Sequence, residues 1–261
     1  MFFNLIDQKI RKAFSDAAIQ YDVLASLQLE IGRELVQKIN ALEGIGQILD
    51  VGMGTGKLTR RLAFYFPEAK VTGMDFADGM IRMAQQKQEG FAIVQADARR
   101  LPFKVDNFDL VVSNLTYQWV DDLAAAFAQI FYSLKPQGRL VATMFGHQTF
   151  QELFDVLIKT KEENSRISWG NRLATQEQIK QAVAHAGFST VSVDYELIDV
   201  HFPDMMALLR WIKDIGANCL SPDIFIGKDH LQRANDYYNK HYRERLGIKS
   251  TFEVVWINAQ K

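Results

Sequence analysis

The chain has 261 residues, 48% of them hydrophobic, which predicts a globular protein with a full core, as one large domain or as a core with a cap. Its 30 Lys and Arg residues balance 31 Asp and Glu residues, so no overall charge field indicates a nucleic-acid or membrane partner. The single cysteine excludes an internal disulfide, and because no apolar run approaches the roughly 20 residues of a membrane span, we expect a cytoplasmic protein.

The first 146 residues show helical spacing followed by an alternating pattern. Residues 5–40 carry apolar residues at helical intervals, and we expect residues 1–40 to form an N-terminal helical lid. Short apolar runs then alternate with helical patterns, which predicts a ligand-binding core over residues 41–146, built as a mostly parallel α/β sheet with helices on both faces. The predicted strands are "QILDV" (47–51), "KVTGMD" (70–75), "FAIVQAD" (91–97), "FDLVVSN" (108–114) and "GRLVATMF" (138–145).

The remaining residues, 147–261, contain two more strand patterns, at 190–200 and 251–259. The segment 201–250 between them is too long for a simple connection. We therefore expect it to form a cap with residues 147–175 over the carboxyl edge of the sheet, where open α/β sheets bind ligands. Further helices are predicted at 148–162, 175–186, 204–217 and 228–244.

The sequence "DVGMGTG" (50–56) predicts a ligand-binding turn between the first strand and a helix. A phosphate-binding P-loop is excluded, because Val51 stands where its first glycine belongs and Leu58 replaces its hydroxyl residue. A dinucleotide site is disfavoured, because Lys57 stands where its third glycine would pack the helix against the strand. The remaining interpretations are the amino-acid end of S-adenosylmethionine and a plain glycine-rich turn.

Asp50 and the glycines favour the first of these interpretations. The carboxylate of Asp50 can pair with the ammonium of a methionine moiety. Gly52, Gly54 and Gly56 let the backbone approach a ligand and adopt dihedral angles that other residues avoid.

Acidic residues also end the next two predicted strands. Asp75 lies 19 residues after Gly56 and can accept hydrogen bonds from both hydroxyls of a ribose. Phe76 can lie against an adenine, and Asp97 can accept from the adenine amino group. Each acid alone is typical of an ordinary strand end, whereas three at successive strand ends favour a cofactor site. We add two neighbours of strand ends to the predicted cofactor set, Ala98 and Asn114.

This set resembles the class I S-adenosylmethionine-dependent methyltransferases over residues 40–146. The resemblance implies S-adenosylmethionine as cofactor and a Rossmann-like, seven-stranded, mostly parallel sheet whose last strand is antiparallel. Methyl transfer depends on in-line positioning and exclusion of water, so we expect no catalytic residue. The five histidines show no metal-ligand spacing, and we expect no metal.

Five segments, four of them in the lid and cap, resemble one methyltransferase family, the malonyl-acyl-carrier-protein O-methyltransferases of biotin synthesis. They are "FSDAAIQYDVLASLQLEIGREL" (14–35), "NLTYQW" (114–119), "TFQEL" (149–153), "NRL" (171–173) and "LLRWIKDIGAN" (208–218). The resemblance implies methylation of the free carboxyl of a malonyl thioester on acyl carrier protein or coenzyme A. Methylation of another small carboxylate or a quinone precursor, and a non-catalytic role as an assembly factor, stay open as alternatives.

A carboxylate entering a water-poor site needs a cation, and arginine suits it best. The resembling cap segments offer Arg172, Arg210 and Lys213, and we expect at least one of the two arginines to hold the malonyl group. Tyr21 is expected to close over both ligands and Trp119 to contact the acceptor.

Two further features of the cap bear on the substrate. His147 and Gln148 stand where this family is expected to have small residues, and they leave the local loop shape open. Residues 228–249 hold six Lys or Arg residues against three acids, so this helix either steers an acidic carrier protein or is a solvated face.

Overall fold

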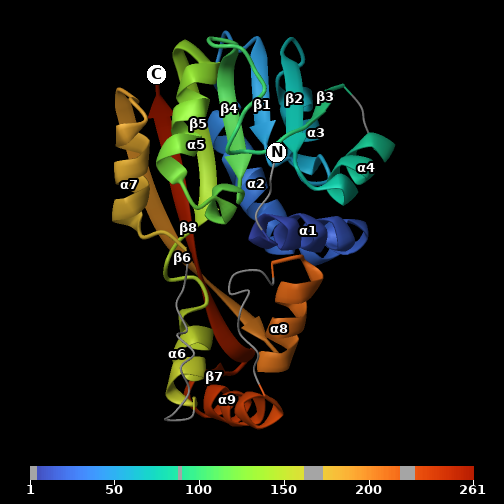
Figure 1. The fold of residues 1–261 in the computed structure, drawn as a ribbon, viewed down its shortest axis with the longest axis vertical. Coiled ribbons are helices and arrows are strands. Elements are labelled where there is room, and N and C mark those ends of the chain that lie inside the picture. Colours follow the sequence, from blue (N-terminus) through green and yellow to red (C-terminus); the bar gives the residue numbers. More distant parts are fainter. Residues whose placement is uncertain (1–4, 88–89, 162–172, 218–226) are drawn as a thin grey trace.

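The computed structural model describes residues 5–87, 90–161, 173–217 and 227–261 (Figure 1). Its strands are β1 (Gln47–Val51), β2 (Lys70–Asp75), β3 (Ala92–Gln95), β4 (Phe108–Asn114), β5 (Leu134–Phe145), β6 (Thr190–Phe202), β7 (Arg243–Glu244) and β8 (Gly247–Gln260). They form an eight-stranded sheet in the order β3-β2-β1-β4-β5-β8-β6, with β7 paired to β8. Strands β1 to β5 are parallel, and β8 is antiparallel to β5 and β6. The predicted fold class is confirmed, and the two-residue β7 brings the strand count to eight.

Helices cover both faces of this sheet. They are α1 (Leu5–Leu24), α2 (Ser26–Ile39), α3 (Lys57–Tyr65), α4 (Asp78–Gln86), η1 (Tyr117–Trp119), α5 (Leu123–Ser133), α6 (Gln151–Lys159), α7 (Gln176–His185), α8 (Met205–Asp214) and α9 (Lys228–His241). Alternate residues of β1 point to opposite faces. Leu49 packs in the core with α5 and α7, whereas Ile48 packs with α2 and α3. Both sides of β1 are thus buried, which explains its continuous apolar sequence.

The cap is built on strands as well as helices. Strand β8 pairs with β5 only as far as Val254, but it continues to pair with β6 down to Ile248. This two-stranded extension carries α6, α8 and α9 below the sheet (Figure 1). The sequence predicted β8 to begin only at residue 251, because Lys249 and Ser250 interrupt the apolar run; pairing with β6 extends it. Helix α9 lies at the end of the cap farthest from the sheet, and its steering role stays a prediction.

The N-terminal helical segment crosses the carboxyl edge of the sheet and separates it from α8 (Figure 1). It is broken into α1 and α2 at Ala25, which departs from helical geometry. Helix α1 approaches α4 so closely that a Cβ on Gly79 would lie 2.1 Å from the Ser15 carbonyl oxygen. In the described residues, no helix combines the length and apolar character needed to cross a membrane. The division into a lid (1–40), a core (41–146) and a C-terminal part (147–261) stays a prediction.

Candidate active site

The glycine turn after β1 forms the floor of the candidate site. Gly52, Gly54 and Gly56 have positive φ, at 75°, 57° and 79°. Two features exclude a side chain at Gly52: its positive φ is unfavourable for other residues, and a Cβ would lie 2.0 Å from Thr116 Oγ1. Glycine therefore lets this turn pass close to the loop after β4, and the turn leads into α3 at Lys57.

Asp75 ends β2 and holds the glycine turn in place. Its Oδ2 accepts a hydrogen bond from the Gly54 backbone N–H at 2.9 Å, and its Oδ1 accepts from the Ala77 N–H at 2.8 Å. Burial raises the pKa of Asp75, and these backbone donors oppose the rise. Each carboxylate oxygen keeps a further lone pair, so Asp75 can support the turn and still accept from the ribose hydroxyls predicted for it.

Asp50 is a buried carboxylate with one unused oxygen. Its Oδ2 accepts from Thr59 Oγ1 at 2.7 Å, whereas its Oδ1 has no hydrogen-bond partner among the described residues. Burial raises the pKa of Asp50 to about 7, with the Thr59 bond opposing the rise and the Asp75 charge adding to it. A ligand group that brings a positive charge, such as the ammonium of a methionine moiety, fits this unpaired oxygen.

A cofactor pocket lies above the turn, between β2, β4 and α1. It brings together most of the predicted cofactor residues: Gly52, Gly54, Asp75, Phe76, Ala98 and Asn114. Tyr21 and Trp119, which the sequence assigned to the acceptor, also line it. Asp50, Gly56 and Asp97 lie outside this lining.

Asp97 is engaged by the protein itself. Arg99 donates to both of its carboxylate oxygens, with Nη2 at 2.6 Å from Oδ2, and also donates to Asp7 of α1 at 2.9 Å. Burial would raise the pKa of Asp97, but the Arg99 guanidinium outweighs it and holds this pKa below its usual value. Ala96 and Ala98, on either side of Asp97, line the pocket. The bond from Asp97 to an adenine amino group stays a prediction.

Helix α1 is held closed over the cofactor pocket by polar contacts. Arg11 donates to Asp78 at 2.7 Å, and Asp22 accepts from Thr55 Oγ1 at 2.5 Å and from Lys87 Nζ at 3.0 Å. The enclosed volume is about 70 Å³, whereas small-ligand sites span roughly 300–1,000 Å³. The pocket in this structure is therefore smaller than a nucleoside-sized ligand requires.

A second, apolar pocket adjoins the first on the side of the cap, and we call it the acceptor pocket. Phe14, Tyr21, Leu115 and Trp119 line both pockets. Cap and strand-end aromatic residues complete the acceptor pocket, among them Phe145, Phe150, Trp211 and Phe252. Phe14 meets Trp119 edge to face at 5.3 Å between ring centroids, which fixes the wall between the pockets.

Tyr21 offers a hydrogen-bond donor at this shared wall. Burial, reinforced by the charges of Asp75 and Asp22, raises the pKa of its hydroxyl far above the usual value. The phenol therefore stays neutral and keeps its proton at any physiological pH. A neutral O–H donor suits an anionic ligand, because hydrogen bonds to carboxylates are the stronger kind.

Two glutamines of the acceptor pocket were not predicted as site residues from the sequence. Gln28 and Gln118 both line it, and the Oε1 atom of each is buried without a hydrogen-bond partner among the described residues. Gln28 is only 6% exposed and shares the buried face of α2 with Ile31 and Leu35. A polar residue on this apolar helical stripe was the signal that could have identified it.

The two predicted cations that the structure describes do not line the acceptor pocket. Arg210 and Lys213 are exposed on α8, and Arg210 Nε donates to the Met206 carbonyl at 3.2 Å. Arg172 lies outside the described residues; its neighbour Leu173 lines the acceptor pocket and contacts the His147 ring through its carbonyl at 3.3 Å. The acceptor-pocket lining, as far as the structure describes it, contains no Lys, Arg or His. In the described ranges no three His, Cys, Asp or Glu side chains form a group that could hold a metal ion.

Comparison with known proteins identifies the family. The "Methyltransferase domain" family model matches residues 49–142. The malonyl-[acyl-carrier protein] O-methyltransferase of Geobacter sulfurreducens is 35% identical over 266 residues, which cover 97% of this chain and 98% of that one. The enzyme of the same name from Hahella chejuensis is 35% identical over 256 residues, covering 94% and 88%.

A solved structure shares the fold. Phosphoethanolamine N-methyltransferase 2 of Haemonchus contortus, in complex with S-adenosyl-L-methionine, superposes with a TM-score of 0.55 at 20% identity, covering 88% of this chain and 52% of that one. At this identity the likeness supports the fold alone. The nearly full-length match at 35% identity goes further: the chain belongs to the malonyl-acyl-carrier-protein O-methyltransferase family.

Proposed function

We propose that the chain is an S-adenosylmethionine-dependent O-methyltransferase that methylates the free carboxyl of a malonyl thioester. The relatives are named for malonyl-acyl-carrier protein, which supports this acceptor and a place in the pimeloyl branch of biotin synthesis. The observation that carries the proposal is the wall shared by two pockets. Tyr21 and Trp119 stand between a pocket that contains Asp75 and an apolar pocket that opens toward the cap.

The residues of the first pocket fit S-adenosylmethionine. Asp75 would accept from the ribose hydroxyls, and Phe76 would lie against the adenine. Outside the pocket lining, the unpaired Oδ1 of Asp50 would pair with the ammonium. The positive end of α3 favours the carboxylate of the methionine moiety. When bound, the cofactor would supply an electrophilic methyl group on a sulfonium, so that an oxygen–carbon bond to a carboxylate could form as the carbon–sulfur bond breaks, with a neutral thioether as the leaving group.

The chain contributes positioning and the exclusion of water. The acceptor carboxylate is ionised at neutral pH and is itself the nucleophile, so no side chain needs to remove a proton. Helix α1 and the aromatic wall of Phe14 and Trp119 exclude water from the space between the ligands. The Tyr21 hydroxyl can hold one carboxylate oxygen and leave the other directed at the methyl group. Apolar walls favour this reaction, because a negative and a positive charge neutralise each other as it proceeds.

Transfer of tritium from methyl-labelled S-adenosylmethionine tests the proposal across acceptors. Malonyl-acyl-carrier protein and malonyl coenzyme A should be labelled, whereas acetyl-acyl-carrier protein, which lacks the free carboxyl, should not be. Labelling of a phenolic quinone precursor instead would move the chain to the quinone alternative. Tight binding of S-adenosylhomocysteine without transfer to any acceptor would favour the assembly-factor alternative.

A further inference from the structure

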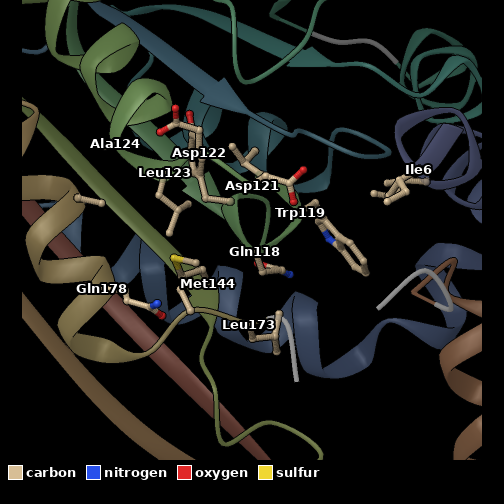
Figure 2. A pocket seen from close by; sticks show the side chains of 15 residues that line it. Ile6, Gln118, Trp119, Asp121, Asp122, Leu123, Ala124, Met144, Leu173 and Gln178 are labelled. Carbon is tan, nitrogen blue, oxygen red and sulfur yellow. The ribbon is translucent and has the colours of Figure 1, made fainter. Parts of the chain in front are cut away.

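An open groove of about 420 Å³ lies beside the acceptor pocket, and its volume is within the range of small-ligand sites. It runs between the start of α1, the loop from η1 to α5, and the first two turns of α7. Figure 2 shows Gln118 and Trp119 between Met144 at one end of the groove and Ile6 at the other. Gln118, Trp119 and Leu173 line both this groove and the acceptor pocket, so the two spaces adjoin each other.

Two polar groups in the groove lining lack partners. The Tyr117 hydroxyl and Gln118 Oε1 are both buried and form no hydrogen bond with any described residue. Tyr117 is fully buried, and its ring packs against Phe127 at 5.2 Å between centroids. A buried polar group that has lost its water without gaining a partner costs roughly 1–3 kcal/mol. The fold tolerates two such groups at one groove, which points to a ligand with its own hydrogen-bonding groups.

We propose that this groove holds the pantetheine arm of the acyl thioester, an inference that rests on the proposed function. The arm is a narrow chain with two amide groups and short methylene spacers. Its amides would supply partners for Tyr117 and Gln118, and its spacers would lie against Ile10, Leu123 and Met144. The thioester end then reaches the acceptor pocket past Trp119 and Leu173.

The negative charge at the rim of the groove and its opening to the surface both agree with a bound pantetheine arm. Asp121 and Asp122 are exposed at its rim, and Asp122 also caps α5 by accepting from the Ala125 N–H at 2.9 Å. Carboxylates at the rim disfavour a phosphate inside the groove, whereas the stretch between the phosphate and the thioester is uncharged. The anionic part of the carrier therefore stays outside, at the open surface.

The test compares full-length and short malonyl thioesters in three variants. Ala124→Trp fills the groove, and Ala125→Trp is its matched control, because Ala125 is exposed on the same helix and does not line the groove. Tyr117→Phe removes the unpartnered hydroxyl and breaks no hydrogen bond to a described residue. The acceptors are malonyl coenzyme A, malonyl-acyl-carrier protein and the ethyl thioester of malonate, which has no arm. Binding of S-adenosylhomocysteine reports on folding of each variant.

We expect Ala124→Trp to raise the ratio of the KM for malonyl coenzyme A to that for the ethyl thioester at least tenfold. Tyr117→Phe should raise this ratio about three- to tenfold, the loss of one ordinary hydrogen bond, without lowering Tm. Ala125→Trp should leave it within twofold. An equal rise in the KM for malonyl coenzyme A and for the ethyl thioester would overturn the inference and leave the proposed function intact. Weakened S-adenosylhomocysteine binding in both groove variants would do the same. Failure of the wild type to methylate any malonyl thioester would overturn both.

Discussion

Replacing Asp75 by alanine separates the two roles that the structure gives to this carboxylate. In the protein it accepts hydrogen bonds from the backbone of Gly54 and Ala77, and in the proposed complex it also accepts from the ribose. The variant therefore loses both the support of the glycine turn and the ligand contact. Charge-assisted hydrogen bonds contribute roughly 1.5–3 kcal/mol, so the Kd for S-adenosylhomocysteine should rise about 10- to 150-fold, at 1.4 kcal/mol for each factor of ten.

The effect of Asp75→Ala on stability should be smaller than the two lost backbone contacts suggest. Two N–H groups lose their acceptor, which costs roughly 1–3 kcal/mol for each that stays unsatisfied. Burial raises the pKa of Asp75, however, so removing the carboxylate also relieves a desolvation cost. A net loss of about 1–3 kcal/mol, or roughly 2–4 °C in Tm per kcal/mol for a chain of this size, is expected.

Asp109→Ala is the matched control for this variant. Asp109 also accepts from two backbone N–H groups, those of Gly46 at 3.0 Å and Gln47 at 2.8 Å, and it pairs with Lys135. It lies near the start of β4, at the edge of the sheet opposite the site. Calorimetric titration should give Asp109→Ala a Kd within twofold of the wild type despite a comparable loss of Tm. An unchanged Kd for folded Asp75→Ala would falsify its assignment to the cofactor, and an equal rise in both variants would show a general effect of stability.

Three further predictions concern charged groups of the protein and of the acceptor. The pKa of Asp50 is raised from 3.8 to about 7, so its contribution to stability is complete below pH 4 and is lost as the pH rises to 7. Asp50→Asn should therefore stabilise the ligand-free protein by about 1–3 kcal/mol at pH 8 and hardly at all at pH 4. A gain in stability that does not depend on pH in thermal unfolding would contradict this. Arg172→Ala should lower kcat/KM on malonyl-acyl-carrier protein by an amount equivalent to ~2–4 kcal/mol of activation free energy. Arg210→Ala is the control, because Arg210 is exposed, and its kcat/KM should stay within twofold of the wild type; the reverse result would show that Arg210 of α8 holds the malonyl carboxylate. Because the acceptor is already ionised, kcat should stay nearly flat from about pH 6.5 to 8.5, and a steep rise near pH 7 would indicate an acceptor that must lose a proton.

The parallel core could be predicted closely from sequence, because burial on both faces leaves a continuous apolar run in each strand. Strands β1, β2 and β4 begin and end where the sequence indicated. The long β6–β8 extension under the cap was only partly predicted, because its distal half is held by pairing between residues such as Val200 and Ser250, which lie far apart in the sequence. Likewise, the break at Ala25 that separates α1 from α2 was not predicted, because no proline or glycine marks it.

The candidate site, like the fold, could be predicted only in part from the sequence. Residues attached to strand ends, such as Asp75 and Asn114, were predicted because parallel strands bring their carboxyl ends to one edge. The contacts that close α1 over this edge, such as Arg99 with Asp7, join residues far apart in sequence and carry no local signal. The apolar acceptor pocket was also missed, since aromatic residues of the cap such as Phe252 are indistinguishable in sequence from ordinary core residues.

The fate of the transferred methyl group distinguishes carboxyl O-methylation from methyl transfer to any other atom. Malonyl-acyl-carrier protein whose free carboxyl is enriched in ¹⁸O should be incubated with the enzyme and S-adenosylmethionine, and the product hydrolysed in alkali. If a carboxylate oxygen attacks the methyl group, the product is a methyl ester, and alkali attacks its acyl carbon to release methanol that carries ¹⁸O. Transferred methyl that stays on the protein or the carrier after alkali, or methanol without ¹⁸O, would contradict carboxyl O-methylation.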